Sequence, residues 1–148
     1  MNPYLGLKFA HVLIAIVALG SGAAVGILTT FFGDDATHGT FVLRLSRKLL
    51  HWLVLPGYAL MLVTGIWMGH LGDLLDAHWA EAAMNLWGVG ALCYALFARF
   101  LRRRITLAEI EGRASPGYRR AALLSSWSGA GVGLVILTIL GYMIFKPG

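Results

Sequence analysis

Charged residues are scarce in this sequence. Asp, Glu, Lys and Arg make up 13% of its 148 residues, about half their usual share in a soluble domain. Hydrophobic residues make up 58%. Cysteine occurs once, at Cys93, which excludes an intrachain disulfide, a zinc–cysteine cluster and a CxxCH attachment site for c-type haem. The composition is therefore typical of a membrane protein.

The apolar residues fall into four long runs, each near the 20 residues that a helix needs to cross about 30 Å of hydrocarbon. The first run is longer than the core of a signal peptide, which favours a retained helix. We therefore predict an all-α integral membrane protein, an antiparallel up-down four-helix bundle forming one domain over 1–148. The predicted spans are about 4–32, 49–68, 82–101 and 121–145.

Basic residues are distributed unevenly between the two sides of the predicted bundle. Ten of the twelve Lys and Arg residues lie in 44–48 and 99–120, and only Lys8 and Lys146 lie on the other side. The positive-inside rule then predicts that the first and third connections are cytoplasmic. Both termini would lie outside, in the periplasm if the protein resides in a bacterial inner membrane. The basic residues indicate contact with anionic lipid and not with nucleic acid.

Small residues recur at helical spacing in the first and fourth spans, at Gly20–Gly26 and Ser125–Gly133. Helices in lipid associate through close contacts between small residues, so these segments are expected to pack against neighbouring helices. Pro56 and Gly57 fall inside the second span and predict a kink there. Aromatic residues near the predicted helix ends fit an interfacial belt: Tyr4, Trp52, Trp67, Trp79, Tyr118 and Tyr142.

His11 is the clearest candidate for chemistry, because ionisable residues inside a membrane are costly and often functional. Small residues, among them Ala15 and Gly22, follow it along the same helix face. A flat haem can lie against such a face while the imidazole ligates its iron. Lys8, one turn above, can pair with a haem propionate. A histidine that is hydrogen-bonded to a neighbouring helix, with the small residues serving packing, explains the pattern equally well.

Three further residues are candidate ligands. Met84 is predicted near the depth of His11, where a thioether can be the second axial ligand, although a methionine in a membrane helix is often filler. His70 and His78, with the aspartates between them, form an HxxDxxDxH pattern on the outer side. These two histidines can ligate copper or another metal, or reach a haem on His11. The alternative is a hydrated loop with interfacial histidines.

The segment Tyr4-Leu-Gly-Leu-Lys8-Phe-Ala-His11 resembles the YLxxKxxH opening of HemJ-type protoporphyrinogen IX oxidases, which are four-helix haem-associated membrane proteins. The segment Leu62-Val-Thr-Gly65-Ile-Trp67 and the closing Lys146-Pro147 are also similar to that family. Met84 stands where the family has a lysine, which places protoporphyrinogen oxidation in doubt. The sequence also resembles the DUF2269 and CopD-like membrane families, and DUF2269 is the favoured group. The resemblance implies the architecture and a haem ligand at His11.

Three functions are therefore open. The leading hypothesis is a membrane protein that binds haem b and has a redox role, with a quinone or a porphyrinogen as electron partner. The second is copper or other metal handling at the outer histidines. The third is a non-catalytic accessory subunit of a larger membrane complex. Four helices with short connections leave little interior volume, so a porphyrin would need a groove on the bundle or a partner helix, which favours a homo-oligomer or a larger complex.

Overall fold

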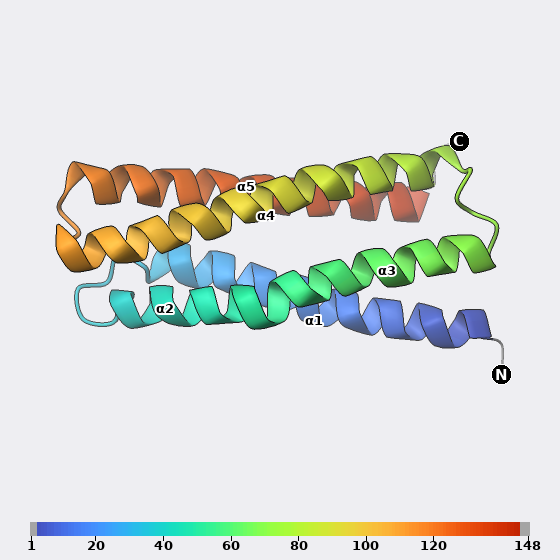
Figure 1. Ribbon diagram of the computed structural model, residues 1–148, viewed down its shortest axis with the longest axis horizontal. Helices are drawn as coiled ribbons and strands as arrows, with labels where there is room; N and C mark the ends of the chain where they lie inside the picture. Colours follow the sequence, from blue (N-terminus) through green and yellow to red (C-terminus); the bar gives the residue numbers. More distant parts are fainter. Residues whose placement is uncertain (1–2, 146–148) are drawn as a thin grey trace.

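The computed structural model describes residues 3–145, and this range is helical without strands. The closing Lys146-Pro147 lies outside the described residues. The elements are α1 Pro3–Phe31, α2 Gly39–Leu49, the π-helix η1 Leu50–Val54, α3 Leu55–Leu71, α4 His78–Ile110 and α5 Pro116–Phe145. The elements α2, η1 and α3 are continuous and form one long helix. The described chain is therefore an antiparallel arrangement of four helices (Figure 1). All four are long and apolar enough to span a membrane, which confirms the predicted all-α fold.

The helices extend beyond the predicted spans. The second helix begins at Gly39, ten residues before the predicted start, and α4 continues to Ile110, nine residues past the predicted end. The connection predicted over 102–120 therefore shrinks to 111–115. A span predicted from hydropathy ends where the apolar run ends. The helix itself continues further, because Arg, Leu and Glu are good helix formers and the backbone stays helical through the charged segments.

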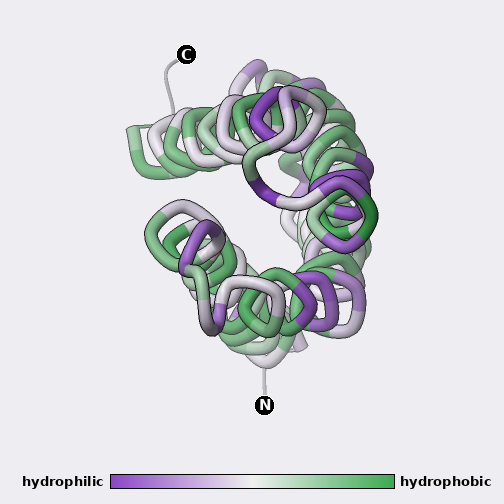
Figure 2. Tube along the Cα trace, turned by 90° about the vertical axis from the view of Figure 1, so that its left-hand side faces the viewer, coloured by the Kyte–Doolittle hydropathy of each residue, from purple (hydrophilic) through white to green (hydrophobic). Residues whose placement is uncertain are grey.

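The four helices form two hairpins. The most extensive packing is between α4 and α5, followed by that between α1 and α3, while α3 and α4 touch over a short stretch. Viewed along the long axis, the helices follow an open arc (Figure 2). The connections 32–38 and 111–115 lie together, at the left of Figure 1, and we call this the basic end.

Glycines allow the close approach of helices that the small-residue pattern predicted. A Cβ added at Gly57 on α3 would lie 2.6 Å from the Cβ of Ala18 on α1. A Cβ added at Gly22 on α1 would lie 2.9 Å from the hydroxyl oxygen of Tyr94 on α4. Both distances are too short for a real contact, so the backbones can approach this closely only because these positions carry no side chain.

The predicted irregularity at Pro56 takes the form of a π turn. Proline has no N–H to bond the carbonyl four residues earlier. The turn directly before it, Leu50–Val54, is wider, and the N–H of Leu55 bonds the carbonyl of Leu50, five residues back. The helix axis changes direction at this point (Figure 1).

An aromatic cluster joins the hairpins near the middle of the spans. The ring of Tyr58 on α3 stacks on that of Trp87 on α4, with centroids 4.9 Å apart and planes 12° apart. Its hydroxyl donates a hydrogen bond to the Trp87 carbonyl at 2.9 Å. Tyr94 packs edge-on against Tyr58, also at 4.9 Å. The interface between the hairpins is therefore aromatic at its centre, while exposed apolar residues such as Leu134, Leu137 and Ile144 on α5 face outward, as a lipid bilayer requires.

Candidate functional site

His11 lies on α1 and is held by α3. Its Nδ1 lies 2.7 Å from Oγ1 of Thr64. The Thr64 hydroxyl lies 2.8 Å from the carbonyl oxygen of Leu60 and 3.2 Å from that of Met61. The histidine of the first predicted motif and the threonine of the LVTGIW segment are 53 residues apart in sequence, and the fold brings them into direct contact.

The contacts of Thr64 favour one tautomer of His11. A threonine hydroxyl has one proton, and three acceptors lie within its reach: the carbonyls of Leu60 and Met61 and the Nδ1 atom of His11. When this proton is donated to a carbonyl of its own helix, the Thr64 oxygen accepts a proton from His11 Nδ1. The other ring nitrogen, Nε2, then carries the lone pair, which is the form that ligates a metal ion.

The surroundings of His11 are small on one side. A Cβ added at Gly65 would lie 3.4 Å from Cε1 of His11, so the backbone of α3 approaches the imidazole closely. Ala15 is half-buried one turn further along α1. Further down the same face the small residues serve packing, because Ala18 meets Gly57, and Tyr94 fills the space beside Gly22.

The other predicted site residues are distributed over α1, α3 and α4. Lys8 is exposed on α1, one turn from His11. Met84 is 39% exposed on α4, in the second hairpin, and α4 packs along α5. His70 near the end of α3 and His78 at the start of α4 are both exposed. Within residues 3–145, no three His, Cys, Asp or Glu side chains converge on a position that could hold a metal ion.

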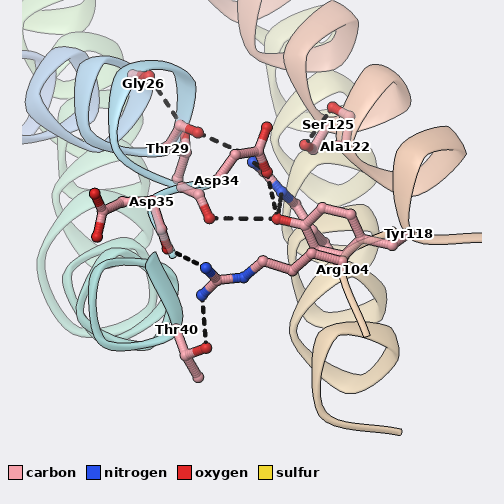
Figure 3. A network of polar contacts seen from close by, with 11 residues as sticks. Gly26, Thr29, Asp34, Asp35, Thr40, Arg104, Tyr118, Ala122 and Ser125 are labelled. Atoms are coloured by element: carbon pink, nitrogen blue, oxygen red, sulfur yellow. Dashed lines mark hydrogen bonds and ion pairs between the residues drawn. The ribbon is translucent and has the colours of Figure 1, made fainter. Parts of the chain in front are cut away.

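A second polar constellation lies at the basic end, around Arg104 of α4 (Figure 3). The Arg104 side chain is only 2% exposed. Its Nε donates to the Tyr118 hydroxyl at 3.1 Å, Nη1 to the Thr29 carbonyl at 3.1 Å, and Nη2 to Asp34 Oδ1 at 2.7 Å. One guanidinium thus joins the end of α1, the first connection and the start of α5.

Tyr118 completes this network, and its prediction as a residue of the interfacial belt is wrong. It is 2% exposed, and its hydroxyl donates to Asp34 Oδ1 at 2.5 Å. The guanidinium carbon of Arg104 also lies 5.4 Å from the centre of the Tyr118 ring. Gly33 leaves room for this arrangement, because a Cβ there would lie 2.6 Å from Nη2 of Arg104. Tyr118 is drawn inward because its hydroxyl has a carboxylate to bond.

The first connection is tied down by a second arginine. Arg113 Nη1 donates to the Asp35 carbonyl, and Nη2 donates to Thr40 Oγ1 at 2.8 Å. The Asp35 carboxylate accepts backbone N–H bonds from Thr37 at 3.0 Å and His38 at 2.6 Å. Both aspartates of this short connection are therefore engaged by the protein itself.

The pKa of Asp34 lies below its ordinary value. Partial burial raises it, but the hydrogen bonds from Tyr118 and Arg104 and the positive charges of Arg104 and Arg113 lower it by more. The carboxylate is therefore ionised at neutral pH and balances the buried guanidinium.

Arg104 was predicted only as one of the ten basic residues that orient the bundle. A signal was present in its spacing, because Tyr94, Phe97 and Leu101 precede it at helical intervals and all four are buried. No comparable signal links His11 to Thr64. The two constellations differ chemically: each nitrogen of Arg104 is bonded to the protein, which marks it as structural, whereas the hydrogen bond of His11 to Thr64 involves Nδ1 and not Nε2.

Comparison with known proteins gives one match. A family model described as a predicted integral membrane protein, DUF2269, matches residues 5–147. No curated protein and no solved structure matches the chain. The resemblance to HemJ-type and CopD-like proteins stays a prediction.

Replacing Arg104 by Gln is expected to lower the free energy of unfolding by about 2–4 kcal/mol, because hydrogen bonds of a buried charge are lost and Thr29 and Tyr118 lose their partner. The matched control is Arg103→Gln, which removes an exposed charge from the neighbouring position and should change stability by less than about 0.5 kcal/mol. Thermal unfolding of both variants in the same detergent measures the difference. Equal stability of the two variants would contradict the structural role of Arg104.

The stabilisation by Asp34 should depend on pH. Because its pKa is lower in the folded protein than in the unfolded chain, the ionised carboxylate stabilises the fold above the unfolded pKa of about 4, and this contribution is lost as pH falls through the folded-state pKa. The stability difference between wild type and Asp34→Asn should therefore be largest near pH 6 and shrink below pH 4. Asp76→Asn, at the opposite end, is the control. A difference that is constant over this range would show that the ionised carboxylate is not what stabilises the fold.

Proposed function

The chain belongs to the DUF2269 family of predicted integral membrane proteins, and we propose that this member binds a b-type haem through His11 and has a redox role. The observation that carries the proposal is the hydrogen bond between His11 Nδ1 and Thr64 Oγ1 at 2.7 Å. Histidines that ligate metals generally donate their second N–H to a protein acceptor, which fixes the tautomer and the ring orientation. Thr64 supplies that acceptor within the membrane span.

The residues around His11 fit a planar group in part. Gly65 keeps side-chain atoms away from the imidazole, and Ala15 keeps α1 small on the following turn. Gly22, which the small-residue pattern included, is covered by Tyr94 and has no part in the proposal. The proposed site is therefore confined to residues 8–15 of α1 and the facing turn of α3 at Thr64 and Gly65.

Each side chain has a defined role in this proposal. His11 Nε2 would bind the haem iron, Thr64 would orient the ring as a positioning residue, and the ammonium group of Lys8, exposed one turn above, would pair with a propionate. Met84, or His70 or His78, supplies the second ligand. The haem, when bound, supplies one-electron chemistry, with a quinone or a porphyrinogen as electron partner.

We further infer that the protein lies in a bacterial inner membrane with the basic end in the cytoplasm. The sequence places ten of the twelve Lys and Arg residues on the side that holds this end. The positive-inside rule applies to short connections such as 32–38 and 111–115. His11 and the connection between α3 and α4 then belong to the periplasmic half.

The haem proposal is tested on protein purified from cells supplied with haem. A reduced-minus-oxidised spectrum of wild type should show sharp Soret and α bands. His11→Ala should abolish them, and Thr64→Val should weaken haem affinity about 10-fold, because only the orienting hydrogen bond is lost. His51→Ala, in the π turn η1 and 13 residues before Thr64, should leave the spectrum unchanged.

The same spectra identify the second ligand. Whichever of Met84→Ala, His70→Ala or His78→Ala shifts the bands marks it. A His11→Ala variant that is folded and keeps the wild-type spectrum would overturn the assignment, and a featureless wild-type spectrum would overturn the haem proposal.

Orientation is tested with single cysteines in a Cys93→Ala background. A membrane-impermeant maleimide applied to intact spheroplasts should label Asp76→Cys and leave Ala114→Cys unlabelled until the membrane is permeabilised. The reverse pattern would place the basic end outside.

A further inference from the structure

A groove lined by charged, polar and two apolar side chains lies near the basic end, between the second helix and α4. It has a volume of about 440 Å³ and is bounded by α2 and η1 on one side and by α4 on the other. The second helix contributes residues at spacings of three and four, including Arg44, Arg47, Lys48 and His51, which places them on one face. Ile105 of α4 forms part of the lining and is itself 5% exposed.

The groove has an excess of positive charge. Arg44 bridges it to Glu109 of α4, with Nη2 and Oε1 2.6 Å apart, so these two charges offset each other. Arg47 and Lys48 line the same groove, and the ion pairs found among residues 3–145 include neither of them. Two neighbouring cations without a carboxylate partner favour an anionic ligand.

The position of the groove indicates that this anion is amphiphilic. Trp52 lies beside His51 at its edge, with ring centroids 5.6 Å apart, and is 78% exposed. It stands where the charged α2 gives way to the apolar α3, which is the depth at which tryptophan lies among lipid headgroups. A ligand here would meet cations at its head and apolar surface at its tail.

We propose that this groove binds the phosphate of an anionic phospholipid, with Arg47 and Lys48 holding the phosphate and Trp52 contacting the upper part of an acyl chain. Arginine binds phosphate oxygens through paired N–H groups, and lysine adds a point charge. The Arg44–Glu109 pair also lines the groove and adds no net charge to it. This site is independent of the haem proposed at His11.

The test uses the full-length protein and dioleoyl-phosphatidylglycerol, with dioleoyl-phosphatidylcholine as the neutral comparison. Binding is followed by native mass spectrometry of the detergent-solubilised protein. Wild type should bind phosphatidylglycerol about 30-fold more tightly than phosphatidylcholine, since Arg47 and Lys48 near a lipid surface contribute about 1 kcal/mol each and about 1.4 kcal/mol is a factor of ten. The double variant Arg47→Gln/Lys48→Gln should lose this preference.

The matched control is Arg102→Gln/Arg103→Gln, which removes the same charge from exposed positions of α4 outside the groove. It should keep the preference within about twofold. Equal losses in both double variants would overturn the proposal, because they would show attraction by the net charge of this end alone.

Two further measurements distinguish the source of the phosphate and the role of Trp52. Inorganic phosphate at millimolar concentration should not displace the lipid, and full displacement would show a site for soluble phosphate and overturn the lipid assignment.

Phosphatidylglycerol with dibrominated chains should quench the tryptophan fluorescence of the wild type more than that of Trp52→Phe. Equal fractional quenching of the two would place the lipid elsewhere. All of the substituted side chains are exposed, so the variants are expected to fold, and single Arg47→Glu provides an independent variant with reversed charge.

Discussion

The buried guanidinium of Arg104 is the constraint on which the arrangement of the two hairpins depends. Helices in lipid gain little from hydrophobic burial against one another, so their association relies on close packing and polar contacts. A charge removed from water is costly unless it is paired and hydrogen-bonded. Arg104 is satisfied only when the end of α1, the first connection and the start of α5 are all in place. Any separation of the hairpins at the basic end would take Thr29 and Asp34 away from that charge and leave it only Tyr118 as a partner.

The contacts that join the hairpins are distributed unevenly along the bundle. Arg104, Arg113 and the Arg44–Glu109 pair join them at the basic end, and Tyr58 joins them near the middle. The proposed haem ligand lies beyond these contacts, in the outer half of the first hairpin. A second ligand such as Met84 belongs to the other hairpin, so a group held between the two would link the halves of the bundle where the protein links them least.

The architecture could be predicted from the sequence, because four long apolar runs specify four spanning helices and the small residues specify close packing. The helix ends could not be predicted, because the Arg-rich segments of α2 and α4 are helical but not hydrophobic. Tyr118 was misplaced because an aromatic residue near a helix end usually lies at the membrane interface. The sequence alone does not show that the Asp34 carboxylate accepts a hydrogen bond from its hydroxyl. The pairing of His11 with Thr64 depends on how two helices align, which no local pattern in one sequence encodes. The haem and metal ligands stay predictions.

The π turn at Leu50–Val54 changes the direction in which the side chains point along one continuous helix. Each residue of an α-helix rotates the side-chain direction by about 100°, and a wider turn absorbs one additional residue without breaking the helix. Before this turn, the helix directs a row of cations away from the core, and after it, the same helix directs Gly57, Tyr58 and Thr64 toward its neighbours. Deleting a single residue from the turn would rotate one row relative to the other. The direction of the exposed cations and the direction of the core-facing residues of this helix are therefore coupled by the length of one turn.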